Sequence, residues 1–154
     1  EPSFHQKEGK HLTEIVLKVL SYCGYKNKKE NCILQCFDAN ELEIVRKELN
    51  SKLFLVQLIE FKEETKKLKH FATFADGIGP WYKQILSEKI DRKFRFTSLV
   101  SDAHKLGLTV HPYTFRADAL NEFSSFKEML QTFLIDANVD GVFTDLVVSF
   151  LRKR

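Results

Sequence analysis

The sequence has few of the residues that shape irregular or cross-linked proteins: 6 glycines, 3 prolines and 3 cysteines among 154 residues. So little glycine and proline excludes collagen-like and low-complexity chains. An odd cysteine count excludes a disulfide framework that pairs every thiol within the chain. Basic residues exceed acidic ones by only 3 charges, so the basic excess of a dedicated nucleic-acid binder is missing.

Two further absences concern membranes and targeting. No apolar run approaches the ~18 residues that a membrane-spanning helix needs. The first residues, Glu1-Pro2-Ser3-Phe4-His5, carry no secretory signal and do not begin with methionine. Neither observation assigns a compartment, and the localisation therefore stays open from the sequence.

What the chain does contain suits an ordinary globular domain. Hydrophobic residues make up 44% of it, charged residues 29%, and 14 phenylalanines supply material for a core. Periodicity predicts helices over residues 11–22, 41–49, 81–90, 97–106 and 125–134, with a last helix over 145–151. Residues 60–69 are charge-rich and fit either a short helix or a solvated loop.

Short apolar runs alternate with these helices. Strands are predicted over residues 32–37, 54–59, 108–113 and 139–144, and a run over 70–75 is expected to lead into a turn at 76–80. Strands that are apolar on both faces and separated by helices favour parallel pairing with the helices outside. Cys32 and Cys36, in the first of these strands, are interpreted as small buried apolar residues.

Several of these runs end abruptly in polar and aromatic residues, which is how a barrel strand looks where its carboxyl end opens into an active site. This form occurs around Asp38, Asp76, His111 and Asp145, and it predicts a TIM-type (β/α) barrel. A complete barrel of this type typically needs ~250 residues. The prediction is therefore that residues 1–154 form only the carboxyl-terminal part of such a barrel, within one domain.

Three ordered motifs resemble one enzyme family. They are Phe74-Ala75-Asp76-Gly77-Ile78-Gly79-Pro80, then Val110-His111-Pro112-Tyr113-Thr114-Phe115-Arg116, then Asp140-Gly141-Val142-Phe143-Thr144-Asp145. With Leu34-Gln35-Cys36-Phe37-Asp38 and the strand at 54–59, they make the chain similar to the carboxyl-terminal part of the glycerophosphodiester phosphodiesterases of periplasmic bacterial type. The resemblance implies hydrolysis of glycerophosphodiesters, such as glycerophosphocholine, to glycerol 3-phosphate and an alcohol.

The resemblance also implies roles for particular residues. Gln35, His111 and Tyr113 are candidate substrate-binding residues, with Tyr113 where many family members carry a tryptophan against the glycerol moiety. For His111 and Gln35 a structural hydrogen bond is the alternative, and for Tyr113 the alternative is packing in the core. Residues expected to shape the pocket are Asp76, Gly77, Gly79, Thr144 and Asp145. The glycines are expected to permit a tight turn, and Asp38, Asp76 and Asp145 to approach one another at the carboxyl edge of the strands.

The family's catalytic and metal-binding motifs are not in this sequence. Hydrolysis of an anionic phosphodiester requires a metal ion to offset charge and a general acid for the leaving alkoxide. The family implies calcium or magnesium, with catalytic residues and metal ligands expected upstream, and no metal ligand is assigned here. Two alternatives stay open: an inactive half-barrel that binds a partner or has no role alone, and another phosphate-binding barrel enzyme.

The family resemblance and the half-barrel prediction also indicate the partners. A glycerophosphodiester is the expected substrate, and nucleic acid is not expected as a partner. A half-barrel has open sheet edges, so self-association of the isolated chain is also expected.

Overall fold

The structure is a computed structural model, and it describes residues 2–9, 11–90 and 93–145. Four strands pair in parallel and in chain order: β1 (Ile33–Cys36), β2 (Phe54–Ile59), β3 (Gly77–Pro80) and β6 (Thr109–Val110). Each strand lies beside its predecessor, which is the succession found in the wall of a (β/α) barrel. The predicted parallel α/β architecture is confirmed, although the sheet formed by the described residues is open and does not close into a barrel.

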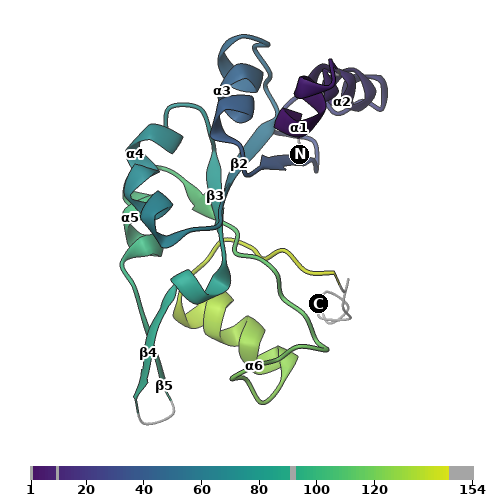
Figure 1. The fold of residues 1–154 in the computed structure, drawn as a ribbon. Coiled ribbons are helices and arrows are strands. Elements are labelled where there is room, and N and C mark those ends of the chain that lie inside the picture. Colours follow the sequence, from purple (N-terminus) through teal and green to yellow (C-terminus); the bar gives the residue numbers. More distant parts are fainter. Residues whose placement is uncertain (1, 10, 91–92, 146–154) are drawn as a thin grey trace.

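Helices alternate with these strands and follow an arc outside the sheet (Figure 1). The connections after β1 and β2 contain α3 (Ala39–Lys47), the 3₁₀ turn η1 (Lys62–Lys67) and α4 (Leu68–Phe71). Helix α5 (Leu99–Lys105) leads into β6, which is followed by α6 (Phe126–Gln131) and a π-helical turn, η3 (Thr132–Asp136). Two helices precede the sheet, α1 (Pro2–Lys7) and α2 (Leu12–Tyr22).

The strand predicted over 139–144 runs beside β6, but it forms only an isolated bridge. The Asp140 and Phe143 amides donate to the carbonyls of Val110 and Pro112, and Phe115 bridges Thr144 in parallel. This segment therefore continues the order of the sheet. The helix predicted over 145–151 lies almost wholly outside the described residues.

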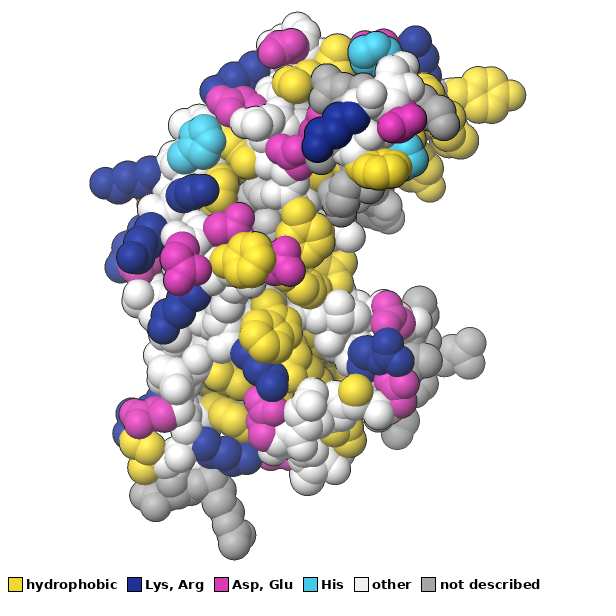
Figure 2. Space-filling model, in the orientation of Figure 1, with side chains coloured by type: hydrophobic (Ala, Val, Ile, Leu, Met, Phe, Trp, Pro, Cys, Tyr) yellow, Lys and Arg dark blue, Asp and Glu magenta, His cyan; other side chains and the backbone are white. Residues whose placement is uncertain are grey.

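The two faces of the sheet differ in burial at the edge strand β1, whereas β2 is buried on both faces, with Val56 and Leu58 on the side away from the helices 0% and 8% exposed. On the face covered by helices, Leu55, Ile59, Ile78 and Val110 are each 0% exposed. The opposite face corresponds to the inside of a barrel, and there Ile33 is 44% exposed. Figure 2 shows hydrophobic side chains gathered in the hollow of this side of the molecule. Strand β1 was predicted to be buried on both faces, and this is wrong because β1 is an edge strand of the described sheet.

Local signals place most helix ends as the sequence predicts. The Asp38 carboxylate accepts a hydrogen bond from the Asn40 amide and so begins α3, and the Ser125 hydroxyl accepts one from the Glu128 amide at the start of α6. Gly107, at φ +75°, terminates α5 in the left-handed conformation that glycine adopts without strain.

The prediction of a helix over residues 81–90 is wrong. Residues 82–84 form a 3₁₀ turn, η2 (Tyr82–Gln84), and β4 (Leu86–Ile90) then pairs antiparallel with β5 (Lys93–Phe96). Cross-strand contacts explain the outcome: the Lys89 ammonium lies 4.3 Å from the centre of the Phe94 ring, and Phe94 packs against Phe123. The hairpin extends away from the sheet (Figure 1).

Among the described residues, no helix is long and apolar enough to cross a membrane.

Candidate functional site

The carboxyl ends of the parallel strands meet at one edge of the sheet, where loops of barrel enzymes carry their active sites. Three aromatic residues and one carboxylate lie there. We call this set the carboxyl rim: Phe37, Glu60 and Trp81, which directly follow β1, β2 and β3, and Tyr113, which lies three residues past the end of β6 and bridges Trp81. Trp81 is 42% and Phe37 37% exposed, so the rim presents aromatic surface to solvent.

Tyr113 is held from several sides. Its hydroxyl donates to the Ile59 carbonyl at 2.9 Å, and its ring meets Phe37 edge to face at a centroid distance of 5.6 Å. Its backbone forms a parallel bridge with Trp81. Burial, reinforced by Glu60 and Glu64, raises the pKa of the phenol to about 12. The phenol therefore stays protonated near neutral pH, and its half-buried ring has a fixed orientation at the rim.

Gln35 lies in β1 on the inner face of the sheet and is exposed. Its segment, together with Phe37 and Leu58, lines a pocket of about 400 Å³ that is closed on the other side by Leu12 and other residues of α2 and α3. In the strand register Gln35 is level with Val56, Gly77 and Thr109, whereas Tyr113 is level with Trp81, which follows β3. The structure therefore does not bring Gln35 to the same edge as Tyr113.

His111 lies lower on the inner face. Its Nε2 is 2.9 Å from the Thr109 hydroxyl, two residues back toward the amino end of β6. Its ring is bracketed by Phe54 and Phe143, with centroid distances of 6.2 Å to each. Burial lowers the pKa of the imidazole, and the Asp140 carboxylate opposes that effect. The ring contacts place His111 in the inner wall, away from the residues of the carboxyl rim.

Gly77 and Gly79 do not form the predicted turn, because both belong to β3 and are fully buried. A Cβ at Gly77 would lie 2.4 Å from the Thr109 hydroxyl, and one at Gly79 would lie 2.6 Å from the Leu58 Cδ2 atom. Both glycines therefore allow neighbouring side chains to pack closely over the inner face, rather than a change in chain direction.

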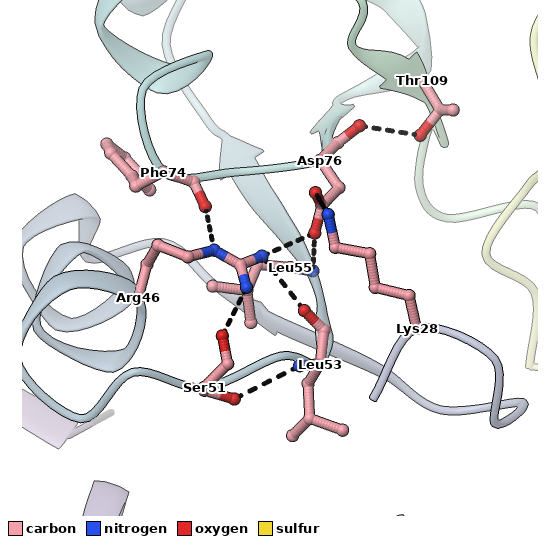
Figure 3. Close-up of polar contacts among 8 residues, drawn as sticks. All are labelled: Lys28, Arg46, Ser51, Leu53, Leu55, Phe74, Asp76 and Thr109. Atoms are coloured by element: carbon pink, nitrogen blue, oxygen red, sulfur yellow. Dashed lines mark hydrogen bonds and ion pairs between the residues drawn. The ribbon is translucent and has the colours of Figure 1, made fainter. Parts of the chain in front are cut away.

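Asp76 precedes β3 and so lies at the amino edge of the sheet, opposite the rim. The expectation that it approaches Asp38 and Asp145 at the carboxyl edge is therefore wrong. Its carboxylate accepts hydrogen bonds from the Leu55 amide at 3.0 Å, from Arg46 at 2.7 Å and from Lys28 (Figure 3). We call Lys28, Arg46 and Asp76 the Asp76 cluster.

Arg46 extends this cluster into the backbone. Its guanidinium also donates to the carbonyls of Phe74 at 2.9 Å and Leu53 at 3.0 Å, and to the Ser51 carbonyl (Figure 3). The arginine thereby connects the end of α3 with the starts of β2 and β3. Because one guanidinium binds four acceptors from these segments, the arrangement stabilises the amino edge of the sheet.

Comparison with known proteins identifies the family. The profile of the Glycerophosphoryl diester phosphodiesterase family matches residues 1–149. The chain belongs to this family. It is 34% identical over 183 aligned residues to the glycerophosphodiester phosphodiesterase of Haemophilus influenzae, covering 98% of this chain and 50% of that protein. The Treponema pallidum glycerophosphodiester phosphodiesterase is 25% identical, with 99% and 52% covered.

A solved structure supports the fold of this phosphodiesterase-family chain. The putative glycerophosphoryl diester phosphodiesterase from Silicibacter pomeroyi matches with a TM-score of 0.61 at 17% identity, over 88% of this chain and 40% of that chain. The family has a TIM-barrel fold, and the described residues form an open part of one. The chain spans about half the length of the curated relatives it matches.

The described residues of this phosphodiesterase-family chain do not fit a metal ion. Within residues 2–9, 11–90 and 93–145, no three His, Cys, Asp or Glu side chains come together in a group that could hold one. The Asp76 carboxylate instead accepts from the Leu55 amide, Arg46 and Lys28, and the Asp140 carboxylate from the Val110 amide and His104.

Thr144 and Asp145, the last predicted pocket residues, lie beside the loop after β6. The Thr144 hydroxyl donates to the Phe115 carbonyl at 2.8 Å, and Asp145 is 3.6 Å from Arg116. Arg116 also pairs with Asp118 at 2.7 Å. These contacts fix the loop that follows Tyr113, on the same side of the sheet as the rim.

Sequence reasoning missed two features of this family member. The Asp140 carboxylate accepts hydrogen bonds from the Val110 amide and from His104, both at 2.8 Å. It resembles Asp76, whose carboxylate also accepts a backbone amide of the preceding strand. The repeated Asp-Gly pair, at Asp76 and Asp140, was the available signal. Gln57, fully buried in β2, was also missed, although it is the one polar residue within an apolar run.

Proposed function

We propose that this chain is the carboxyl-terminal part of an enzyme that hydrolyses glycerophosphodiesters to glycerol 3-phosphate and an alcohol. The match of the family profile to residues 1–149 carries the proposal. Two relatives that align with almost the whole chain are named as glycerophosphodiester phosphodiesterases, which supports the same activity. We assign catalysis to the complete polypeptide, because these residues correspond to about half of each relative.

We assign substrate contact to the carboxyl rim. Tyr113 supplies a fixed aromatic face suited to the C–H surface of a glycerol moiety, and Phe37 extends that face. Gln35, exposed on the inner face, supplies amide groups that can hydrogen-bond hydroxyl or phosphoryl oxygens. His111 forms the wall beneath, where its contacts with Phe54 and Phe143 limit the depth of the site.

Calcium or magnesium is proposed as the cofactor, with its ligands and the catalytic acid and base outside residues 1–154. Membership of the family supports this assignment. Removal of divalent ions with a chelator should abolish hydrolysis by the complete polypeptide. The isolated chain should bind neither ion by titration calorimetry, and binding with micromolar affinity would contradict the placement of the ligands.

The decisive test is hydrolysis itself. The complete polypeptide, supplied with calcium or magnesium, should release glycerol 3-phosphate from glycerophosphocholine or a related diester in a coupled assay. Failure with every glycerophosphodiester tested would overturn the proposed function. The isolated 154-residue chain should be inactive in the same assay, and efficient hydrolysis by it would show that the catalytic groups lie within the chain.

Tyr113→Ala tests the rim in the complete polypeptide. Loss of the aromatic face should raise KM by up to about tenfold, since one aromatic contact contributes about 0.5–1.5 kcal/mol. Tyr113→Phe, which keeps the ring, should retain most of the affinity. Tyr22→Ala is the control, because Tyr22 is 93% exposed on α2. Unchanged kinetics in Tyr113→Ala would remove this residue from the substrate site.

We also infer that the isolated chain self-associates. Within the described residues, β1 pairs only with β2, and the neighbouring inner face exposes Ile33. An unpaired strand edge beside apolar surface favours association with another chain. Sedimentation velocity should show oligomers that Ile33→Lys weakens. A monodisperse monomer at high concentration would contradict the inference.

A further inference from the structure

Gln57 is a polar residue in an apolar layer. It lies in β2 on the helix-covered face, between Leu55 and Ile59, and all three residues are 0% exposed. A buried amide is destabilising unless hydrogen bonds replace those it made with water. The partners of Gln57 therefore indicate what its burial achieves.

The side-chain nitrogen of Gln57 faces three carbonyl groups. Its Nε2 lies 2.9 Å from the Phe37 and Leu58 carbonyls and 3.4 Å from the Cys36 carbonyl. The opposite orientation of the amide would turn Oε1 toward three acceptors, so the contacts determine which atom is the donor. Oε1 then has no hydrogen-bond partner within the part of the chain that the structure describes.

These contacts extend the pairing of β1 with β2 beyond its last residue pair. The register of the two strands ends with Cys36 opposite Gln57, and Phe37 is the first residue past it. The Gln57 side chain donates a hydrogen bond to the Phe37 carbonyl there, at the point where the backbone leaves the sheet for α3. The side chain thus determines where the rim segment after β1 begins.

The same strand holds the second aromatic residue of the rim. Ile59, two residues after Gln57, accepts the hydrogen bond from the Tyr113 hydroxyl, and the Tyr113 ring packs on Phe37. The end of β2 therefore restrains both residues. The Gln57 side chain binds the backbone carbonyl of Phe37, and the Ile59 carbonyl accepts the hydrogen bond from the Tyr113 hydroxyl. The edge-to-face contact between the two rings depends on both restraints.

We infer that Gln57 is a positioning residue for substrate binding: its amide places Phe37 so that the Phe37–Tyr113 pair keeps its geometry at the rim. This inference rests on the proposed function. Methionine has a similar volume and would fill the same space without burying an unpartnered oxygen. Packing alone therefore gives no reason for glutamine here, whereas capture of the Phe37 carbonyl does.

The test uses Gln57→Met in the complete polypeptide. Loss of the hydrogen bond to Phe37 should raise KM by about fivefold and leave kcat within about twofold. In a Phe37→Ala background the same change should have little effect on KM, because the ring it positions is gone. Leu55→Val is the control, since it perturbs the same face of β2 at the other end and should lower Tm without changing KM.

Hydrogen–deuterium exchange separates the inference from the proposed function. Gln57→Met should accelerate amide exchange in the segments around Phe37 and Tyr113, and Leu55→Val should not. If wild-type protein hydrolyses no glycerophosphodiester, the proposed function fails, while exchange still decides the positioning role. Unchanged exchange around Phe37, or an equal KM increase in the Phe37→Ala background, would overturn the inference.

Discussion

Replacing Arg46 by methionine should destabilise the protein through the amino edge of the sheet. The arginine side chain is only 20% exposed, and its guanidinium is within hydrogen-bond distance of four oxygens, including Asp76 at 2.7 Å. Methionine retains much of the aliphatic length but none of the donors. The change would leave three backbone carbonyls without this partner and the Asp76 carboxylate with Lys28 and the Leu55 amide.

The size of the effect follows from burial. Breaking a fully buried ion pair costs about 3–5 kcal/mol, whereas an exposed pair contributes about 0–1 kcal/mol. The Asp76 side chain is 15% exposed and keeps two other donors, so we expect a loss of about 2–3 kcal/mol. At about 2–4 °C per kcal/mol for 150–250 residues, Tm should fall by about 4–12 °C, and less in a longer polypeptide.

Differential scanning calorimetry of the complete polypeptide measures this shift. Arg116→Met is the matched control, because Arg116 is 51% exposed and pairs with Asp118 at the surface. It should lower Tm by no more than about 4 °C. Arg46→Lys should recover only part of the loss, since an ammonium cannot reach four oxygens in the geometry of a guanidinium. Equal Tm values for Arg46→Met and Arg116→Met would refute the reasoning from burial.

Three further outcomes are expected. Because burial lowers the pKa of His111 below its ordinary value of 6.5, the unfolded chain binds a proton that the folded chain does not, so stability should decline as pH falls below about 6.5. Tm measured between about pH 7 and about pH 5 should decline less steeply in His111→Asn, and parallel curves would contradict this account. The pKa of Tyr113 is raised to about 12, so its contribution to stability should disappear as pH rises from about 10 through about 12; Tyr113→Phe should lack this part of the alkaline denaturation curve. Gly79→Ala should cost about 1–3 kcal/mol in urea unfolding, because its Cβ would lie 2.6 Å from Leu58, and the cost should shrink in a Leu58→Ala background.

The parallel wall of the fold could be predicted because its signal is local. Residues 54–59 form an apolar run in which Gln57 is the one polar residue, and they form the internal strand β2. Asp38, Gly107 and Ser125 act at helix ends as their residue types suggest. The carboxyl-edge position of Tyr113 followed from the strand that precedes it.

The hairpin could not be found in the same way, because its stability comes from partners across the turn and beyond it. Residues 81–90 carry apolar side chains at spacings that also fit a helix, and the alternation at 93–96 was the one local sign of a strand. Asp76 was misplaced for a related reason. The chain from 68 to 75 is a short helix and turns, so β3 begins after Asp76 and not before it.

The partners of Gln57 and Arg46 could not be predicted, since both residues act on backbone carbonyls. Nothing in the sequence marks which carbonyls lack a partner within the sheet or helix. Gln57 satisfies one at the end of β1, and Arg46 satisfies those that precede β2 and β3. Such contacts become visible only when the path of the backbone is known.

The Asp76 carboxylate has a consequence for the geometry of the whole barrel. It accepts the amide of Leu55, and Asp140 likewise accepts the amide of Val110, so each carboxylate recognises one position along the preceding strand. Sliding either strand pair by one residue would place a different amide there and turn every side chain to the opposite face. In a closed barrel the stagger between strands sets their tilt and the diameter. These two aspartates therefore hold two of the strand staggers on which the diameter of such a barrel depends, from the edge opposite the carboxyl rim.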